Sequence, residues 1–173
     1  MLAMITTASP LGALRLYAVS DALVGLYLPA QAAPPGVERG VDVLRCAAAQ
    51  LAEYFAGQRR VFDLPLRPRG TGFQALVWGA LTQIRLGETR SYRELARSIG
   101  RPSAYRAVGA ANGQNPISII VPCHRLIASN GDLAGYAGGL AAKRWLLDHE
   151  RAMASGPGTP GAEVGSPRAV SPA

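Results

Sequence analysis

Three short, largely apolar runs near the start of the chain are separated by stretches of polar and turn-forming residues. The runs occupy residues 4–7, 13–19 and 23–28, and the stretches between them, 9–12 and 20–21, have turn composition. Short apolar runs bounded by turn residues are typical of β-strands. The pattern therefore predicts an antiparallel meander.

Apolar residues then recur at helical spacing. Residues 41–56 predict an amphipathic helix that ends at Gly57 and covers one face of the sheet. Cys46 falls within its alanine- and leucine-rich pattern, so we expect this side chain to fill the core. Residues 61–66 are expected to add an edge strand, and the proline- and glycine-rich residues 65–70 are expected to link a second domain.

The second domain opens with another helical pattern, which follows Thr71 as its N-cap and continues to Ile84. Ser91 and Glu94 have the spacing of a capping box, which predicts a short helix. A further helix is predicted over residues 103–112. Two short helices joined by a tight turn indicate a helix-turn-helix.

An apolar, β-branched run at residues 117–121 predicts a short buried strand that ends at Pro122. Cys123 follows, with His124 and Arg125 as neighbours. Such neighbours lower the pKa of a thiol from about 8.5 and favour a nucleophile. The alternative is that Cys123 is a small buried hydrophobic residue and that His124 lies on the surface.

These patterns divide the chain into three parts, with an α/β fold of the α+β kind. Residues 1–68 form an N-terminal domain with a small antiparallel sheet and a helix. Residues 69–151 form a mostly helical domain that closes with a helix over residues 140–150. Residues 152–173 are rich in Gly, Pro, Ala and Ser, which predicts a disordered tail.

Composition limits the kinds of site that the chain can build. It holds two cysteines and two histidines without the close pairs that a structural zinc site needs, so we expect neither a metal nor a disulfide. The sequence contains no signal-like segment and no apolar run near the roughly 20 residues that span a bilayer. We therefore expect a protein of the reducing cytoplasm with no membrane partner.

Positive charge is concentrated in one segment. The chain has a net charge of +7, yet residues 59–125 alone contain 11 arginines and three acidic residues. A local basic stripe is typical of a phosphate-binding surface. The alternative, that arginine simply replaces lysine throughout, explains why Lys143 is the only lysine but does not explain the clustering.

The second helix of the predicted helix-turn-helix has an unusual composition for a reader of the major groove. Ala104, Ala107 and Gly109 leave few long side chains to reach base edges, and Arg106 is its one long cation. Such a surface suits a narrow groove into which the arginine inserts. The alternative is that the alanines only pack the helix on the core, but arginines on the preceding helix favour DNA.

The motifs of the second half of the chain, taken together, resemble those of the O6-alkylguanine-DNA alkyltransferases, also called methylated-DNA–protein-cysteine methyltransferases. The resemblance runs from Phe73 to Glu150. It is carried by Ser91-Tyr92 with Glu94-Leu95-Ala96, Arg106-Ala107-Val108-Gly109, Asn112-Gly113 with Asn115-Pro116, Ile120-Val121-Pro122-Cys123-His124-Arg125, Gly135-Tyr136 with Gly138-Gly139-Leu140, and Lys143 through Leu147 to Glu150.

The resemblance implies direct-reversal DNA repair, in which an alkyl group moves from O6 of guanine, and from O4 of thymine, onto the protein. Cys123 would attack the alkyl carbon while His124, through a water, takes the thiol proton. Glu150 would orient His124, Tyr92 would donate a hydrogen bond or proton to the departing guanine, and Asn115 would hold the cysteine loop. The thioether cannot be hydrolysed, so each molecule is expected to act once, without a cofactor.

The resemblance also implies how double-stranded DNA is bound. The helix would enter the minor groove, Arg106 would take the place of the extruded nucleotide, and the alkylated guanine would flip into a pocket of a monomeric protein. The pocket residues are expected to be Tyr136, Gly138, Val121 and Pro122. Further contacts with DNA are expected from Ser91, Tyr92, Ala104, Ala107, Gly109 and Arg125.

Two residues depart from the family pattern. Arg85 stands where proline is common, and Tyr105 precedes Arg106 where a small residue is usual. Two other functions also remain open. A protein that binds alkylated DNA without repairing it would lack the nucleophile, so Cys123 argues against this function. A helix-turn-helix regulator would recognise undamaged DNA, and the alanine-rich second helix argues against that one.

Overall fold

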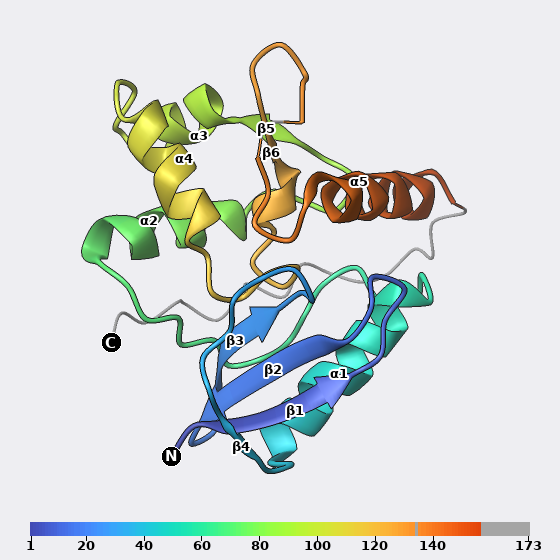
Figure 1. Cartoon of the computed structure of the whole chain (residues 1–173). Helices are drawn as coiled ribbons and strands as arrows, with labels where there is room; N and C mark the ends of the chain where they lie inside the picture. Colours follow the sequence, from blue (N-terminus) through green and yellow to red (C-terminus); the bar gives the residue numbers. More distant parts are fainter. Residues whose placement is uncertain (134, 157–173) are drawn as a thin grey trace.

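The protein consists of a sheet unit and a helical unit that lie against each other (Figure 1). The structure, a computed structural model, describes residues 1–133 and 135–156. The sheet unit contains β1 to β4 and α1. The helical unit contains α2 to α5, a short two-stranded ladder and a single 3-10 turn. This arrangement confirms the predicted fold class.

The predicted antiparallel meander is confirmed. Its strands are β1 (Ala3–Thr7), β2 (Leu14–Val19) and β3 (Ala22–Tyr27), and each pairs antiparallel with the next. A fourth strand, β4 (Val37–Glu38), pairs parallel with β1 and gives the sheet order β3-β2-β1-β4. Two residues in a proline-rich loop carry no periodicity, so this strand was not predicted.

The predicted amphipathic helix is α1 (Asp42–Phe55), which covers one face of the sheet (Figure 1). Its inner face is fully buried against the strands and includes Leu44, Ala47 and Leu51. The prediction that Cys46 fills the core is wrong, because this residue lies on the outer side of the helix and is exposed.

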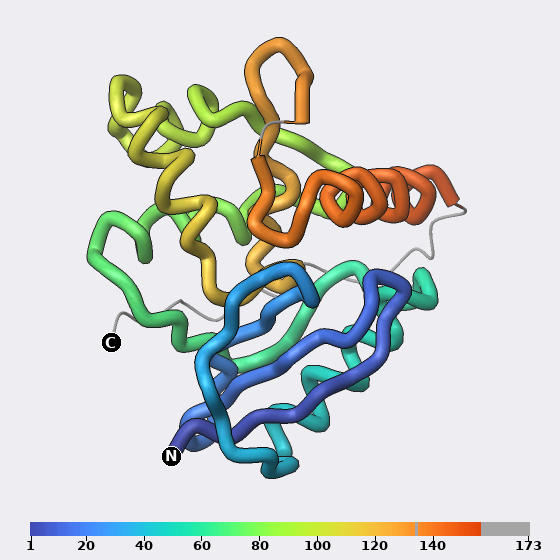
Figure 2. The backbone as a smooth tube through the Cα atoms, in the orientation of Figure 1, coloured from blue at the N-terminus to red at the C-terminus, as the bar shows by residue number. Residues whose placement is uncertain are grey.

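The predicted edge strand at residues 61–66 is also wrong. Strand β3 is one of the two edges of the sheet, and its Leu23 exchanges two backbone hydrogen bonds of 2.8 Å, with Pro65 and Arg67. The result is one bridge, since Pro65 has no N–H to continue a ladder. Figure 2 shows this stretch of chain passing between the two units. It therefore covers the free edge of β3 and joins the units.

The helical unit begins with α2 (Gly72–Leu81), which ends three residues before the predicted Ile84. Thr71 caps it in a reciprocal capping box with Gln74, which satisfies two of the free N–H groups at the helix start. The indole N–H of Trp78 donates to the carbonyl of Ala111 (2.8 Å). Ala111 lies in the second helix of the helix-turn-helix, so this bond connects α2 to that helix.

The helix-turn-helix consists of α3 (Tyr92–Ser98) and α4 (Tyr105–Gly113). The capping box predicted for Ser91 and Glu94 is present. Gly100 ends α3 with a φ of 70°, and the N–H of the next residue reaches back to the carbonyl of Ala96 (2.9 Å). A left-handed residue with this bond is a Schellman motif, which glycine adopts without strain.

The last helix, α5 (Leu140–Ser155), runs four residues into the segment predicted as a tail. Alanine and methionine at positions 152–154 are strong helix formers, so they extend the helix instead of ending it. Residues 157–173 of the predicted tail lie outside the described residues. Within the described part of the chain, none of the helices combines the length and apolar character that crossing a membrane requires.

Candidate active site

The apolar run before Cys123 is a buried set of turns, and the prediction of a strand there is wrong. Ile117 makes a single bridge to β3, and the chain then turns at Ile119, whose φ is 70°. Positive φ strains a β-branched residue. The Asn115 amide holds the turns, because it donates to the carbonyls of Ile117 (3.3 Å) and Val121 (2.9 Å) and accepts from the N–H of Ile117 (3.0 Å). This is the geometry expected if Asn115 holds the cysteine loop.

Cys123 begins a 3-10 turn, η1 (Cys123–Arg125), directly after Pro122. The φ and ψ of Pro122 are −81° and 63°, and the N–H of Cys123 donates to the carbonyl of Val121 (2.8 Å). These values define an inverse γ-turn, which reverses the chain within three residues. Cys123 lines a pocket. Val121 and Pro122 are buried and are not among the residues that line this pocket, so their contact with a flipped base stays a prediction.

A small ladder places Tyr92 beside the cysteine loop. Strand β5 (Arg90–Ser91) pairs parallel with β6 (Leu126–Ile127), which directly follows η1. Tyr92 follows β5 as the first residue of α3, so the ladder sets its position relative to Cys123. The Tyr92 ring also lies against α4, where an added Cβ on Gly109 would stand 3.6 Å from it. Tyr92 and Cys123 consequently line the same pocket.

The pocket has a volume of about 350 Å³ and is lined by residues of both units. They are Gln31, Tyr92, Gly109, Asn112, Gly113, Asn115, Ser118, Cys123, Gly135, Tyr136 and Ala137. Tyr136, a predicted pocket residue, is among them, and Gly138, also predicted, is not. A Cβ on Gly138 would stand 2.9 Å from the Tyr136 ring and 2.8 Å from Leu28. Because Gly138 has no side chain, the Tyr136 ring can occupy this space.

Gln31 belongs to the sheet unit and lines the pocket. No pattern in the sequence predicts this residue there. Its Oε1 accepts hydrogen bonds from the N–H of Leu28 (2.8 Å) and the hydroxyl of Ser118 (3.1 Å). Both partners are donors at these contacts, so the amide oxygen must face them. A glutamine in a proline-rich loop has no sequence signature, and only the packing of the two units brings it to the site.

Burial dominates the chemistry of the Cys123 thiol. It raises the pKa of Cys123 above the usual value, although a hydrogen bond from Asn115 and the charge of Lys143 oppose this rise. The expectation of a lowered pKa for Cys123 is therefore wrong in the protein without DNA, because burial outweighs the neighbouring cation. The thiol is protonated at neutral pH, and a nucleophilic thiolate requires a nearby proton acceptor.

His124 and Glu150 are the pair predicted to supply that acceptor, and the structure places the two side chains in contact. Nε2 of His124 lies 2.8 Å from Oε1 of Glu150, and both side chains are fully buried. Burial would raise the pKa of Glu150, but the His124 and Arg125 partners hold it far below its ordinary range. Burial also lowers the pKa of His124. The pair is therefore a carboxylate and a neutral imidazole whose Nε2 carries the proton, which leaves Nδ1 as the base.

Arg125 is a partner of Glu150, so the prediction that it contacts DNA is wrong. Its Nε and a terminal nitrogen each lie 2.8 Å from a different oxygen of the Glu150 carboxylate, and its other terminal nitrogen donates to the carbonyl of Ile84. Only 7% of the residue is exposed. Arginine matches a carboxylate in this two-bond geometry. Lys143 is equally enclosed and donates to the carbonyl of Leu126 (2.6 Å).

Unpaired buried polar atoms gather at this one site. Within residues 1–133 and 135–156, buried side-chain atoms without a hydrogen bond are Nδ1 of His124, Oδ1 of Asn112 and the hydroxyl of Tyr136. Asn112 and Tyr136 line the pocket with Cys123, and His124 is the next residue in the chain. Leaving such atoms unpaired costs roughly 1–3 kcal/mol each. Two of the three unpaired atoms thus belong to residues that line the pocket, where a polar ligand could supply the missing partner.

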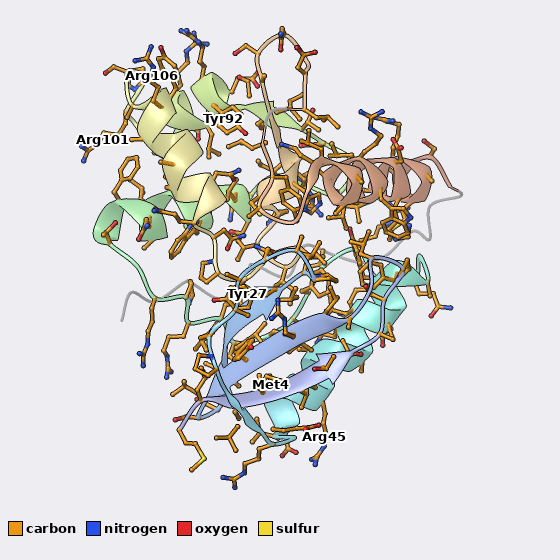
Figure 3. The ribbon with its side chains drawn as sticks, in the orientation of Figure 1. Met4, Tyr27, Arg45, Tyr92, Arg101 and Arg106 are labelled. Atoms are coloured by element: carbon orange, nitrogen blue, oxygen red, sulfur yellow. The ribbon has the colours of Figure 1, made fainter. Side chains whose placement is uncertain are left out.

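The predicted DNA-contacting residues lie on or beside the helix-turn-helix. Arg106 is exposed, and Figure 3 shows it with Arg101 on the outer side of the helical unit, away from the sheet. Ala107 is exposed, and Ala104 is half-buried as the N-cap of α4. Ser91 accepts the N-cap bond of α3 and lines an open basic hollow with Arg90, Arg93 and Arg97. The DNA contacts themselves stay predictions.

The two residues that depart from the family pattern have defined surroundings. Arg85 is exposed just after Ile84. Tyr105 is half-buried against the core and stacks with Arg93, whose guanidinium carbon lies 4.3 Å from the ring centroid. The guanidinium of Arg106 lies 5.8 Å from the same ring. Tyr105 therefore joins α3 to α4 and lies beside Arg106 through cation–π contacts.

The chain matches one described protein family in its second half. The family model described as 6-O-methylguanine DNA methyltransferase, DNA binding domain, covers residues 72–152. A methylated-DNA–protein-cysteine methyltransferase of Methanosarcina barkeri is 59% identical over 106 residues, which make up 61% of this chain and 67% of that protein. The protein of that name from Mycobacterium tuberculosis is 47% identical over 152 residues, 86% of this chain and 92% of that protein.

Solved structures agree with these matches over both units. The crystal structure of Mycobacterium tuberculosis O6-methylguanine methyltransferase covers 88% of this chain and 94% of that chain, with 46% identity and a TM-score of 0.82. The structure of Mycobacterium tuberculosis OGT in complex with DNA covers 87% of this chain and 94% of that chain, with 46% identity and a TM-score of 0.83. The similarity thus includes the sheet unit, where the sequence motifs are weakest.

Proposed function

Because the chain belongs to the methylated-DNA–protein-cysteine methyltransferase family, we propose that it repairs alkylated DNA by moving the alkyl group onto its own Cys123. Its partner is DNA, since a relative of the same fold was crystallised with DNA. The observation that carries the assignment of Cys123 is its place in a pocket with Tyr92, directly before the buried His124 and Glu150 pair.

The reaction that this geometry supports is a single displacement. Sγ of Cys123 forms a bond to the alkyl carbon as the bond from that carbon to O6 of guanine breaks. The thiol proton passes through a water to Nδ1 of His124, and the imidazolium that forms is stabilised by the Glu150 carboxylate. Burial raises the pKa of Tyr92, which keeps its hydroxyl protonated as a donor to the departing guanine. The product is a thioether, so one molecule acts once.

Access to the alkyl group requires the damaged base to leave the duplex. O6 of guanine faces the major-groove edge within the base stack, where a thiol buried in a pocket cannot approach the alkyl carbon in line. We propose that α4 enters the minor groove of double-stranded DNA with its small residues and that Arg106 fills the place of the flipped nucleotide. The same chemistry extends to O4 of alkylated thymine. We further propose that the protein acts as a monomer in the cytoplasm, where its thiol stays reduced.

Mass spectrometry tests the assignment directly. The full chain is incubated with a duplex that contains one O6-methylguanine, its intact mass is measured, and the modified residue is mapped by peptide sequencing. We expect one methyl group per molecule, on Cys123. The chain offers an internal control, because Cys46 is an exposed thiol. Cys46→Ala should react as the wild type does, and Cys123→Ala should bind the duplex but accept no methyl group.

Two results would contradict the proposal. Methylation of the Cys123→Ala variant, or a methyl group mapped to Cys46, would remove Cys123 as the nucleophile. An unchanged mass together with tighter binding to the damaged duplex than to an undamaged one would instead favour a protein that recognises damage without repairing it.

A further inference from the structure

Asn112 lies in the last turn of α4, at the point where the DNA-binding helix meets the pocket. Only 5% of the residue is exposed, and it lines the pocket together with Cys123. It belongs to the motif that resembles the family, but neither its position in the sequence nor the reaction described above assigns it a role.

The orientation of the Asn112 amide is fixed by one hydrogen bond. Its Nδ2 donates to the backbone carbonyl of Cys123 at 3.3 Å. A carbonyl oxygen can only accept, so the amide nitrogen must face Cys123 and the amide oxygen must occupy the other position. That oxygen, Oδ1, is buried and makes no hydrogen bond within the described residues. It is an acceptor that requires a donor.

The alkylated base carries one kind of donor. Alkylation of O6 removes the proton from N1 of guanine, so N1, N3 and N7 are all acceptors. The exocyclic N2 amine is the group that still donates. The hydroxyl of Tyr92, by contrast, is a donor and suits the acceptor atoms of the base. The pocket therefore offers an acceptor and a donor that match guanine in complementary ways.

From this geometry we infer that Oδ1 of Asn112 accepts a hydrogen bond from the N2 amine of the flipped O6-alkylguanine and that Asn112 is a specificity-determining residue for guanine. The inference rests on the proposed alkyl transfer to Cys123. It follows that bases without this amine leave a buried acceptor unpaired and react more slowly. O4-alkylthymine is one such base, and O6-methylhypoxanthine, which differs from O6-methylguanine only by lacking the amine, is another.

The N2 amine of the base and the side-chain amide of Asn112 can be removed separately, the first in the DNA and the second by substitution. Two duplexes of one sequence, with O6-methylguanine or O6-methylhypoxanthine at the same position, are reacted with excess protein, and the rate of methylation of Cys123 is followed by intact mass. The wild type should react about tenfold faster with the guanine duplex, as expected when a buried acceptor loses its donor. In Asn112→Leu, which has nearly the same size but no acceptor, the ratio of the two rates should approach one.

The control is Gln83→Leu, which makes the same chemical change at an exposed position of the same unit, outside the pocket. It should keep the wild-type ratio. Asn112→Ala, which cannot overfill the site, is measured beside Asn112→Leu, and a circular dichroism melt shows that each variant is folded.

The outcomes separate this inference from the proposed function. Equal rates on the two duplexes in the wild type would overturn the role of Asn112 and would mean that solvent satisfies its Oδ1, while methylated Cys123 would still support the repair reaction. A tenfold preference that survives in both Asn112 variants would also overturn it. Failure of the wild type to take a methyl group from either duplex would remove the proposed function and this inference together.

Discussion

Tyr54 of α1 donates a hydrogen bond to Oε1 of Glu150 of α5 at 2.8 Å, although the two residues are 96 positions apart. Both are fully buried. The same carboxylate oxygen also meets Nε2 of His124 and a terminal nitrogen of Arg125, each at 2.8 Å. A residue of the sheet unit thus completes the hydrogen bonds of the carboxylate that orients His124. The sheet unit is therefore part of the support for the reactive site.

Replacing Tyr54 with phenylalanine removes this bond and keeps the ring packing. Hydrogen bonds to charged groups contribute about 1.5–3 kcal/mol, so Tyr54→Phe should lower the free energy of unfolding by an amount in that range. The methyl-transfer rate should fall severalfold, because the Glu150 carboxylate is held less firmly. A carboxylate with one donor fewer is also more basic, which raises the pKa of His124 and moves the acid limb of the rate profile upward in pH.

Urea unfolding and single-turnover rates at several pH values check this prediction. Tyr27→Phe is the matched control, because the hydroxyl of Tyr27 makes no side-chain hydrogen bond to any described residue, and its removal should change neither quantity. A loss of stability in Tyr54→Phe without any shift of the rate profile would mean that Tyr54 is structural only.

Alanine substitutions of Arg125 and Arg106 should affect different properties, the first the stability of the fold and the second the reaction with duplex DNA. Arg125→Ala leaves the buried Glu150 carboxylate without its two-bond partner, and breaking a buried pair costs about 3–5 kcal/mol. Arg106 is exposed, so Arg106→Ala should change the free energy of unfolding by less than about 0.5 kcal/mol. It should instead slow transfer from duplex DNA tenfold or more, since the flipped base loses the side chain that replaces it in the stack.

Thermal melts and transfer rates from duplex DNA, measured on both variants, distinguish the two roles. The assignment of Arg125 would be wrong if Arg125→Ala melted like the wild type and lost only DNA affinity. The assignment of Arg106 would be wrong if its alanine variant repaired duplex DNA at the wild-type rate.

The parts of the molecule that could be predicted from the sequence are those whose cause is local. Ser91 and Glu94 cap α3 because their spacing alone lets each satisfy the other's N–H. Glu150 could be predicted as the partner of His124 because both residues lie in motifs that resemble those of the family. The prediction of a strand before Cys123 was wrong because the apolar pattern has no local cause in one backbone conformation. A buried run is apolar in any backbone conformation, and here the Asn115 side chain supplies the hydrogen bonds that a neighbouring strand would supply.

Residues whose role depends on a distant partner could not be predicted. Arg125 has the same sequence neighbours whether it faces DNA or Glu150, and only the packing of α5 decides between them. Gln31 and Tyr54 reach the site because the sheet and helical units dock, as Figure 1 shows. Neither lies in a motif. The sequence therefore predicts candidate reacting groups, but it gives no signal for residues that reach the site from a distant part of the chain.

Replacing Gly138 with alanine, which adds only a methyl group, should disturb the pocket. Its added Cβ would approach a Tyr136 ring carbon at 2.9 Å and the buried Leu28 at 2.8 Å, and both distances are shorter than ordinary contacts. Gly138→Ala should therefore push the Tyr136 ring into the pocket, slow methyl transfer severalfold and destabilise the fold by about 1–3 kcal/mol. Gly79→Ala is the control, because a Cβ there meets no atom within 4 Å and alanine favours its helix by up to about 1 kcal/mol. Equal transfer rates in the two variants would show that the Tyr136 ring tolerates displacement.

The rate of alkyl transfer should be independent of pH over a wide range. The pKa of His124 is lowered by burial below its usual 6.5, so the imidazole is still a neutral base at pH 6.5. The pKa of Cys123 is raised by burial above its usual range, so the protonated thiol predominates up to about pH 9. Between these limits both groups are in the protonation states that His124-assisted attack requires, and single-turnover rates should form a plateau from pH 6.5 to 9.0.

The contrasting mechanism is attack by a thiolate that forms without His124, and it predicts a different slope. Below the pKa of Cys123, the thiolate fraction rises about tenfold for each pH unit, and the rate would rise with it. His124→Gln removes the base, so this variant should show that slope at a much lower absolute rate. Single-turnover rates at saturating protein, from pH 6 to 9.5, measure both profiles. A wild-type rate that climbed tenfold between pH 7 and pH 8 would rule out His124 as the proton acceptor, because the imidazole is already neutral throughout that interval.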